Sequence, residues 1–420
     1  MSVGFPYPVK WFFCTEYARE RLDSSESESL AAKMKMNEVF IGPVQGETGI
    51  EGLRLDFNFG LRLEIPAGNW HVRVSDADSG CTIFEDDLSA TVLQSVEAYY
   101  VRWQIDVARD GIFVFSHTFD ASGQNVFFIF RSTMLGDALA LFPYVREWQR
   151  MRGSRVSYFA PDNLQGLLQR LYPDIPLYRR VPDNTYATYF LTAGINGPAD
   201  LPTDGRLMPL WQAGRLLLDL PRPIMFSDVS SWLPPRREIM EPYVCISVQA
   251  SVVRKGWLYP GGWERVTEYL KQLGYRVLCI DKERMAESED GISKMPEQAE
   301  DFTGNHPLTA RADLLYHADF FIGLGSGLAW LARTVGCPVI MISGFSYPWT
   351  EFPTPYRIFN RLVCNGCYND IHSKFLSKGC RYPRKSKRWM ECSRTISPAM
   401  VIEAIDRLRD DNRKDDACNG

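Results

Sequence analysis

A glycine-rich turn late in the chain has residue types that could bind phosphate. It lies between a short apolar run and a helical apolar pattern, and it contains Gly323, Gly325, Ser326, Gly327 and Leu328. The first amides of a helix lack intrahelical partners and lie at the positive end of its dipole, so they attract anions. No Lys-Ser/Thr pair follows the turn and the full dinucleotide-binding spacing is absent, so a simple tight turn is the alternative.

Two charged residues, Asp137 and Lys255, each follow a buried strand pattern, which is where ligands of α/β proteins bind. Asp137 ends the predicted turn 134–137. It is either a helix-capping residue or a carboxylate base aimed into a cleft. Lys255 lies beside Arg254 in an aromatic loop, where a cation would neutralise a diphosphate leaving group. A solvated basic loop is the alternative for this pair.

Three further polar residues follow strand patterns in the second half of the chain and are candidates for binding a nucleotide. Asp281 and Glu283 end the strand pattern 276–280, and an acidic residue there often binds ribose hydroxyls. Gln249 opens the loop that carries Lys255 and belongs to the same predicted site. A solvated loop is an equally good interpretation of the two acidic residues.

Four cysteines in one short basic stretch have the types needed for a closed metal site: Cys364, Cys367, Cys380 and Cys392. The C-N-G-C spacing brings two thiolates to one ion, and two more cysteines complete a tetrahedral S4 site suited to zinc or iron. A redox-active C-x-x-C pair is the alternative, and His372 could replace one ligand. Five other cysteines stand in apolar contexts and are predicted to lie in cores: Cys14, Cys81, Cys245, Cys279 and Cys337.

Composition excludes several classes of protein. The chain has 420 residues, of which 45% are hydrophobic, so two or three domains with large cores are expected. A formal net charge of -4 argues against a nucleic-acid binder, and no apolar run reaches the ~20 residues of a membrane span. The N-terminus lacks a basic segment followed by an apolar one, which predicts a cytoplasmic protein in which disulfides are rare.

Apolar periodicity predicts a β-rich region followed by two α/β units. Period-two alternation in the first part favours a small β-sandwich or barrel with a hairpin turn at 109–111. Strands are expected later at 126–130, 155–159, 243–248, 276–280, 320–322 and 338–342, with helices at 138–151, 163–171, 263–273, 308–317 and 328–334. The expected domains are 1–122 (β-rich), 123–235 (first Rossmann-like, acceptor side), 236–360 (second Rossmann-like, nucleotide-sugar side), 361–396 (cysteine finger) and 397–420 (C-terminal helix and tail).

Together these segments resemble the lipopolysaccharide heptosyltransferase family, glycosyltransferases with the GT-B fold of two facing Rossmann domains. The matching positions are Leu135-Gly136-Asp137, Lys255 with Trp257, Pro260 and Trp263, and the stretch from Gly323 through Ala332. Gly325 and Trp330 depart from that family, which has Asp and His there. The sugar or acceptor contacts of those two residues therefore do not carry over.

The β-rich N-terminus and the cysteine cluster narrow the resemblance to the TibC type of bacterial autotransporter heptosyltransferases, and it covers nearly the whole chain. This resemblance implies transfer of heptose from ADP-heptose to serine hydroxyls of an autotransporter adhesin passenger in the cytosol. It also implies one iron ion per subunit on the four cysteines, where the residues alone would suggest zinc, and assembly into a dodecamer.

For such a transfer we predict Asp137 as the base and Lys255 as the residue that stabilises charge on the β-phosphate. The amides of Ser326, Gly327 and Leu328 are expected to bind the diphosphate. Two other functions fit parts of the pattern. One is a lipopolysaccharide-type heptosyltransferase with a saccharide acceptor, and the other is a metal-stapled scaffold without catalysis.

Overall fold

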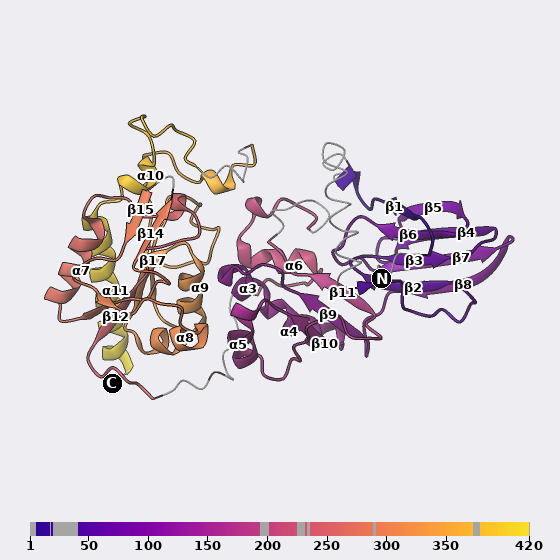
Figure 1. The fold of residues 1–420 in the computed structure, drawn as a ribbon, viewed down its shortest axis with the longest axis horizontal. Coiled ribbons are helices and arrows are strands. Elements are labelled where there is room, and N and C mark those ends of the chain that lie inside the picture. The colour runs from indigo at the N-terminus through magenta and orange to yellow at the C-terminus, as the bar shows by residue number, and fades with distance from the viewer. Residues whose placement is uncertain are drawn as a thin grey trace.

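The computed structural model describes residues 6–16, 18–19, 41–193, 201–224, 232, 236–288, 291–372 and 379–419. Three regions follow one another along the long axis of the molecule (Figure 1). An indigo β-rich region lies at one end, a magenta α/β unit lies in the middle and an orange α/β unit lies at the other end. The arrangement agrees with the predicted order of one β-rich region and two α/β units.

The N-terminal strands form a β-sandwich, as their period-two pattern predicts. One sheet has the order β5-β4-β7-β8 and contains β4 (Trp70–Asp76), β5 (Thr82–Leu88), β7 (Trp103–Arg109) and β8 (Ile112–Thr118). Asp110 and Gly111 form the β7–β8 turn with φ of 51° and 78°, the left-handed conformation that a two-residue hairpin needs. Phe57 on the facing sheet stacks on His117 of β8 with ring centroids 5.7 Å apart, which joins the two layers.

The second sheet of the sandwich continues into the first α/β unit. Its seven strands are, in spatial order, β1 (Val9–Phe12), β6 (Thr91–Ser95), β3 (Arg62–Ile65), β2 (Arg54–Asn58), β11 (Ala187–Phe190), β9 (Asn125–Ile129) and β10 (Arg155–Phe159). The pairs β2–β11, β11–β9 and β9–β10 are parallel, whereas β2 pairs with β3 in the antiparallel sense. The sheet therefore crosses the expected boundary between 122 and 123 without a break.

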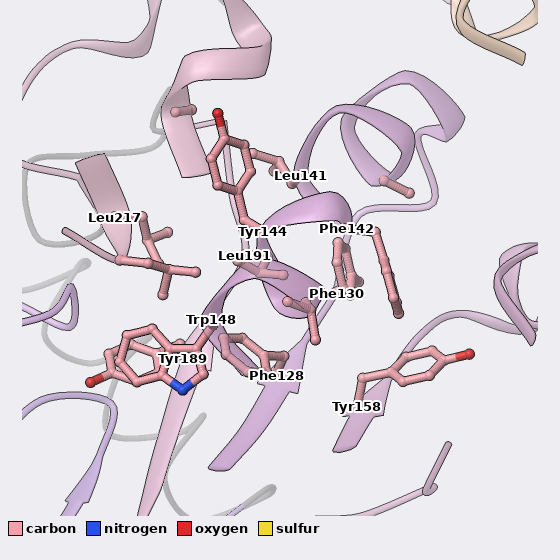
Figure 2. Packing of buried hydrophobic residues seen from close by; sticks show 14 of the residues in the cluster. Phe128, Phe130, Leu141, Phe142, Tyr144, Trp148, Tyr158, Tyr189, Leu191 and Leu217 are labelled. Carbon is pink, nitrogen blue, oxygen red and sulfur yellow. The ribbon is translucent and has the colours of Figure 1, made fainter. Parts of the chain in front are cut away.

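The helices of the first α/β unit cover these parallel strands. They are α3 (Leu135–Leu141), α4 (Pro143–Arg152), α5 (Asp162–Leu171) and α6 (Ala213–Leu217), with the 3₁₀ helices η2 (Gly205–Leu207) and η3 (Leu210–Gln212). The single helix predicted over 138–151 is wrong, because Pro143 lacks an amide hydrogen and its ring disturbs the preceding turn. Phe142, at the junction, is fully buried and stacks on Phe130 with centroids 5.3 Å apart (Figure 2).

The second α/β unit is an all-parallel sheet with the order β16-β13-β12-β17-β18-β19. Its strands are β12 (Tyr243–Ile246), β13 (Arg276–Cys279), β16 (Glu300–Asp301), β17 (Phe321–Leu324), β18 (Val339–Ile342) and β19 (Arg357–Ile358), and the hairpin β14 (Met285–Ser288) and β15 (Gly291–Lys294) is inserted after β13. Counted along the chain, this order is 3-2-1-4-5-6, that of a Rossmann sheet. The order reverses between β12 and β17, so a ligand is expected beyond the carboxyl ends of these two strands.

The helices of the second unit are α7 (Gly262–Gln272), α8 (Leu308–His317), α9 (Gly327–Thr334), α10 (Glu391–Arg394) and α11 (Pro398–Asn419), with the 3₁₀ helices η4 (Val253–Lys255) and η5 (Cys367–Asn369). The predicted helix 308–317 is reproduced at both ends. The long α11 packs back on this unit, where Asp406 accepts a 2.5 Å hydrogen bond from the hydroxyl of Tyr269 on α7. Among the residues described, no helix combines the length and the apolar character that crossing a bilayer requires.

Candidate functional site

The N-terminal turns of α3 and α9 meet at the junction of the two α/β units. A Cβ atom on Gly136 would lie 3.0 Å from the Trp330 ring, and one on Gly327 would lie 2.8 Å from Cβ of Leu135. Both glycines therefore permit a close approach that a side chain would prevent. The approach brings the predicted base on α3 next to the predicted phosphate-binding turn on α9.

Asp137 lies in the first turn of α3, directly beyond the strand β9. The N-cap residue of this helix is Met134, so the helix-capping alternative for Asp137 is wrong. The Oδ2 atom of Asp137 accepts a hydrogen bond from the Ser132 hydroxyl at 3.3 Å. Burial raises the pKa of the Asp137 carboxyl, and the charge of Lys255 and the Ser132 hydrogen bond oppose this rise. A partly exposed carboxylate with a raised pKa has the properties of a general base.

Lys255 ends the 3₁₀ helix η4, in the loop that follows β12. It is partly buried, which does not support a fully solvated basic loop. Its Nζ atom lies 6.0 Å from the centre of the Phe345 ring, and the Arg254 guanidinium lies 5.1 Å from the same centre. The aromatic face holds the two cations together. Since the Lys255 charge influences the Asp137 carboxyl, the loop after β12 and the start of α3 belong to one site.

The glycine-rich turn connects β17 to α9, as the sequence predicts. Ser326 is the N-cap residue of α9 and has extended backbone, and its side chain makes no capping hydrogen bond. Its amide donates to the carbonyl of Leu324 at 2.7 Å, so the structure does not support the prediction that this amide binds the diphosphate. Helix geometry provides no acceptor for the amides of Gly327 and Leu328 in the first turn. Both residues are partly exposed, so these amides are available to an anion at the positive end of the α9 dipole.

Gly325, in contrast, is buried, and a carboxylate from a distant segment fills the space beside it. A Cβ atom on Gly325 would lie 2.5 Å from Oε1 of Glu351. Glu351 accepts hydrogen bonds from the Ser346 hydroxyl at 2.6 Å and from Nη2 of Arg357 at 2.8 Å. Sequence reasoning missed Glu351, because 26 positions of chain separate it from the glycine and no motif links them.

The acidic pair after β13 divides into one buried and one exposed residue. Asp281 is 2% exposed, and its carboxylate accepts hydrogen bonds from the Ser247 hydroxyl at 2.6 Å and from the amides of Val248 and Gln249 at 2.8 and 3.4 Å. These contacts, with a longer one from the Cys279 thiol, use its acceptor positions within the protein. The geometry therefore assigns Asp281 to positioning the loop after β12 and does not support ribose binding by this residue.

Glu283 is exposed and remains the acidic candidate for contact with a nucleotide. Its backbone carbonyl accepts a 2.7 Å hydrogen bond from the side-chain amide of Gln249. Gln249 thus ties the loop after β12 to the loop after β13. The structure brings Gln249 and Glu283 together at the carboxyl edge of the sheet.

The loop after Cys367 attaches the second unit to the first. Arg206 of η2 donates to the backbone carbonyls of Asp370 and Ile371, each at 3.3 Å. The side-chain amide of Asn369 donates in turn to the carbonyl of Arg206 at 2.8 Å. Asp204 forms a largely buried ion pair with Arg206 at 2.6 Å, which fixes the guanidinium. The cysteine-rich segment therefore contacts both halves of the molecule, as its yellow trace in Figure 1 suggests.

The four cysteines of the predicted metal site are all among the described residues. Within this part of the chain no three His, Cys, Asp or Glu side chains form a group at metal-binding spacing, and this finding includes the four cysteines. Burial and the neighbouring thiols raise the pKa of Cys392 to about 12, and they raise those of Cys364 and Cys367 as well. The Cys380 sulfur accepts hydrogen bonds from two backbone amides, at 3.4 Å each.

The turn between the first two cysteines is tight. Gly366 has φ of 66°, the left-handed conformation that favours glycine. Sulfur is the donor that thiophilic ions such as iron and zinc prefer, and the two amides that donate to Cys380 would stabilise a thiolate there. His372, the alternative ligand, is exposed. The core assignment of Cys81 is wrong, because this residue lies exposed in the β4–β5 turn.

Comparison with known proteins agrees with this geometry. Residues 49–111 match the family model of the glycosyltransferase TibC N-terminal domain, and residues 226–383 match glycosyltransferase family 9 (heptosyltransferase). The autotransporter heptosyltransferase BAHTCr of Citrobacter rodentium is 38% identical, over 88% of this chain and 92% of its own. BimC of Burkholderia thailandensis, named an inactive autotransporter heptosyltransferase, is 34% identical, over 85% of this chain and 86% of its own.

Among solved structures, the dodecameric iron-containing heptosyltransferase TibC of enterotoxigenic E. coli, in complex with ADP-D-beta-D-heptose, is similar over 88% of this chain and 98% of its own. The TM-score is 0.80 at 35% sequence identity. The fold of this chain is therefore a GT-B-like glycosyltransferase fold with an extra N-terminal domain.

Proposed function

Because the chain belongs to the autotransporter heptosyltransferase family, we propose that it transfers heptose from ADP-heptose to serine hydroxyls of an autotransporter adhesin passenger. The observation that carries the proposal is the contact between α3 and α9. It brings the Asp137 carboxylate of one unit to the helix N-terminus and the cationic loop of the other. A base beside an anion-binding turn is the arrangement that transfer from a sugar diphosphate requires.

The donor would bind along the carboxyl edge of the second sheet. The amides of Gly327 and Leu328 would hold the diphosphate, and Lys255 would lie beside the β-phosphate. Glu283 and Gln249 would lie towards the nucleoside. The complex of TibC with ADP-D-beta-D-heptose supports ADP-heptose as the donor.

In the proposed reaction the serine oxygen attacks C1 of the heptose and forms the new C–O bond. The bond from C1 to the β-phosphate oxygen breaks with its electron pair, and ADP leaves. The serine proton passes to the Asp137 carboxylate, while Lys255 stabilises the charge that grows on the β-phosphate. Attack and departure on opposite faces of the sugar invert its anomeric configuration.

The first test is the intact mass of an acceptor. The purified protein would be incubated with ADP-heptose and an autotransporter passenger fragment, and with a fragment whose serines are replaced by alanine. Mass increases in whole-heptose steps on the first fragment only are expected. An unchanged first fragment with intact donor would contradict the proposal.

We further propose that Cys364, Cys367, Cys380 and Cys392 hold one iron ion per subunit in a structural role. Iron in the similar TibC supports this choice over zinc. Four thiolate ligands leave no open coordination position on the metal for catalysis. The ion would therefore cross-link the cysteine-rich segment and stabilise its fold. Elemental analysis of Cys364→Ser should show the loss of one iron per chain, whereas Cys81→Ser, which changes an exposed cysteine elsewhere, should retain it. Equal iron content in the two variants, or zinc in its place, would contradict this assignment.

The dodecamer of TibC supports a homo-oligomer of the same size for this protein, and we propose a cytoplasmic location. Native mass spectrometry of the purified protein would give the number of subunits. A mass of one or two chains at micromolar concentration would contradict the dodecamer. Cell fractionation would test the location.

A non-catalytic scaffold is the second candidate, because BimC is named inactive and is 34% identical over most of this chain. A scaffold would keep the fold and the metal site and would leave ADP-heptose intact in the presence of any acceptor. The release of ADP during the mass experiment decides between the two functions.

A further inference from the structure

Glu351 is a largely buried carboxylate in direct contact with the turn that precedes α9. The residue is 7% exposed, and its Oε1 atom occupies the space that a side chain on Gly325 would need. Gly325 is therefore required at its position by a residue from another segment. The two residues form one feature of the site, although the sequence separates them.

The surroundings of Glu351 fix the carboxylate and balance its charge. Oε2 accepts from Nη2 of Arg357 at 2.8 Å, and this ion pair is 6% and 9% exposed in its two side chains. Oε1 accepts from the hydroxyl of Ser346, which is itself 1% exposed. Since Arg357 neutralises the carboxylate, Glu351 can lie near a bound diphosphate without strong repulsion. Each carboxylate oxygen accepts two hydrogen bonds, so these contacts leave acceptor positions on both oxygens.

The segment that carries Glu351 also lies at the junction of the two units. The backbone carbonyl of the preceding residue, Thr350, accepts a 2.8 Å hydrogen bond from the amide of Leu210 in the first unit. Glu351 therefore directly follows a residue that contacts the unit carrying Asp137. A sugar joined to a diphosphate at the α9 terminus would lie at this junction.

We propose that Glu351 is a donor-binding residue whose carboxylate accepts hydrogen bonds from hydroxyls of the donor sugar, with Gly325 making room for it. Replacing a buried ion pair by apolar side chains is often neutral or stabilising, so stability alone is a weak reason for this pair. Sugar hydroxyls are hydrogen-bond donors, and a carboxylate is the strongest acceptor that a side chain offers them. This inference rests on the proposed function, since it assumes that a sugar diphosphate binds at α9.

Calorimetric titration with two ligands, ADP and ADP-heptose, tests the inference. In wild type, ADP-heptose should bind more tightly than ADP because the sugar adds contacts. In Glu351→Gln the affinity for ADP should persist, whereas the affinity for ADP-heptose should fall about tenfold or more, as for a lost hydrogen bond to a charged group. The matched control Glu297→Gln, at an exposed glutamate of the same unit, should leave both affinities unchanged.

A second variant keeps the test decisive if loss of the ion pair with Arg357 prevents folding. Gly325→Ala retains Glu351 and Arg357 but adds a methyl group where Oε1 lies, so it should displace the carboxylate and reduce the preference for ADP-heptose. An equal loss of both ligands in the variants would show that Glu351 only supports the turn, and an unchanged preference would show that it has no role in sugar binding. Either result overturns the inference. Equal affinity of wild type for ADP and ADP-heptose would overturn the proposed donor as well, so the two failures are distinguishable.

Discussion

Asp137 and Asp281 each follow a parallel strand, one in each α/β unit, and have opposite surroundings. Each follows a buried parallel strand, and burial raises the pKa of each carboxyl. Asp281 is 2% exposed and accepts hydrogen bonds from two backbone amides and a serine hydroxyl. Asp137 is partly exposed, and the hydrogen bond that Ser132 donates to it is long, at 3.3 Å.

The difference separates a carboxylate that is held by internal contacts from one whose acceptor positions are largely open. A carboxylate whose acceptor positions are used inside the protein holds a loop in place and has no free lone pair for a substrate proton. A carboxylate with few internal partners keeps that capacity, and partial burial brings its pKa closer to the working pH. Strand-end position alone therefore does not identify a base, and the count of internal donors does.

The largest expected effect is the loss of transfer in Asp137→Asn. The amide cannot take the serine proton, so kcat should fall by roughly 10²–10⁴-fold, while ADP-heptose affinity and the melting temperature stay near wild type. Steady-state kinetics with calorimetry and thermal melts measure all three. Asp162→Asn, at the exposed first-turn aspartate of α5, is the matched control and should be fully active. Normal turnover by Asp137→Asn would show that Asp137 is not the base, and the proposed difference in role between Asp137 and Asp281 would then be wrong.

Lys255→Ala should lower kcat and donor affinity together, by roughly 10–10³-fold in kcat/KM, because a charge beside the leaving group is lost. It should also change the pH profile. Activity is lost as the pH falls through the raised pKa of Asp137, and the Lys255 charge keeps that pKa lower than burial alone would. The acidic limb of kcat should therefore move to higher pH in the variant. Lys271→Ala on α7 serves as the control. If the acidic limb of the kcat profile does not move in Lys255→Ala, Lys255 and Asp137 do not interact.

Asp281→Asn should reduce stability with a smaller effect on chemistry. The amide nitrogen would face donors that now meet a carboxylate oxygen, so the free energy of unfolding should fall by about 1–3 kcal/mol. Denaturant unfolding measures this loss, with Asp183→Asn at an exposed site as the control. A variant of wild-type stability with selectively weakened nucleotide binding would restore the ribose-binding interpretation.

Ser132→Ala should have the smallest effect. Its hydroxyl lowers the pKa of Asp137, so removing it should shift the acidic limb of kcat upward by less than about one pH unit. Ser251→Ala, at an exposed serine in the loop after β12, should not shift it. A downward shift in Ser132→Ala would mean that the hydrogen bond stabilises the protonated carboxyl.

The strands and helices that position the site could be predicted because each has a strong local pattern. The continuous apolar runs at β9, β12 and β17 indicate parallel strands buried on both faces, and the helix 308–317 has its ends where the pattern changes. The break at Pro143 was predictable from proline chemistry and was missed because the apolar spacing continues across it. The continuity of the sheet across 122 and 123 depends on strand pairing, which no local pattern specifies.

The sequence by itself was enough to predict the two turns at strand ends and to select Asp137, Lys255 and the four spaced cysteines as candidates. These features are local, because the geometry of a turn follows from neighbouring residues. Only the tertiary structure decided that Asp281 is used internally and that Glu351 fills the space beside Gly325. Burial and hydrogen-bond saturation are properties of the packed chain and depend on segments far apart in sequence. The sequence shows which chemical groups are present. Whether a carboxylate oxygen still has a lone pair available for a ligand depends on the tertiary structure.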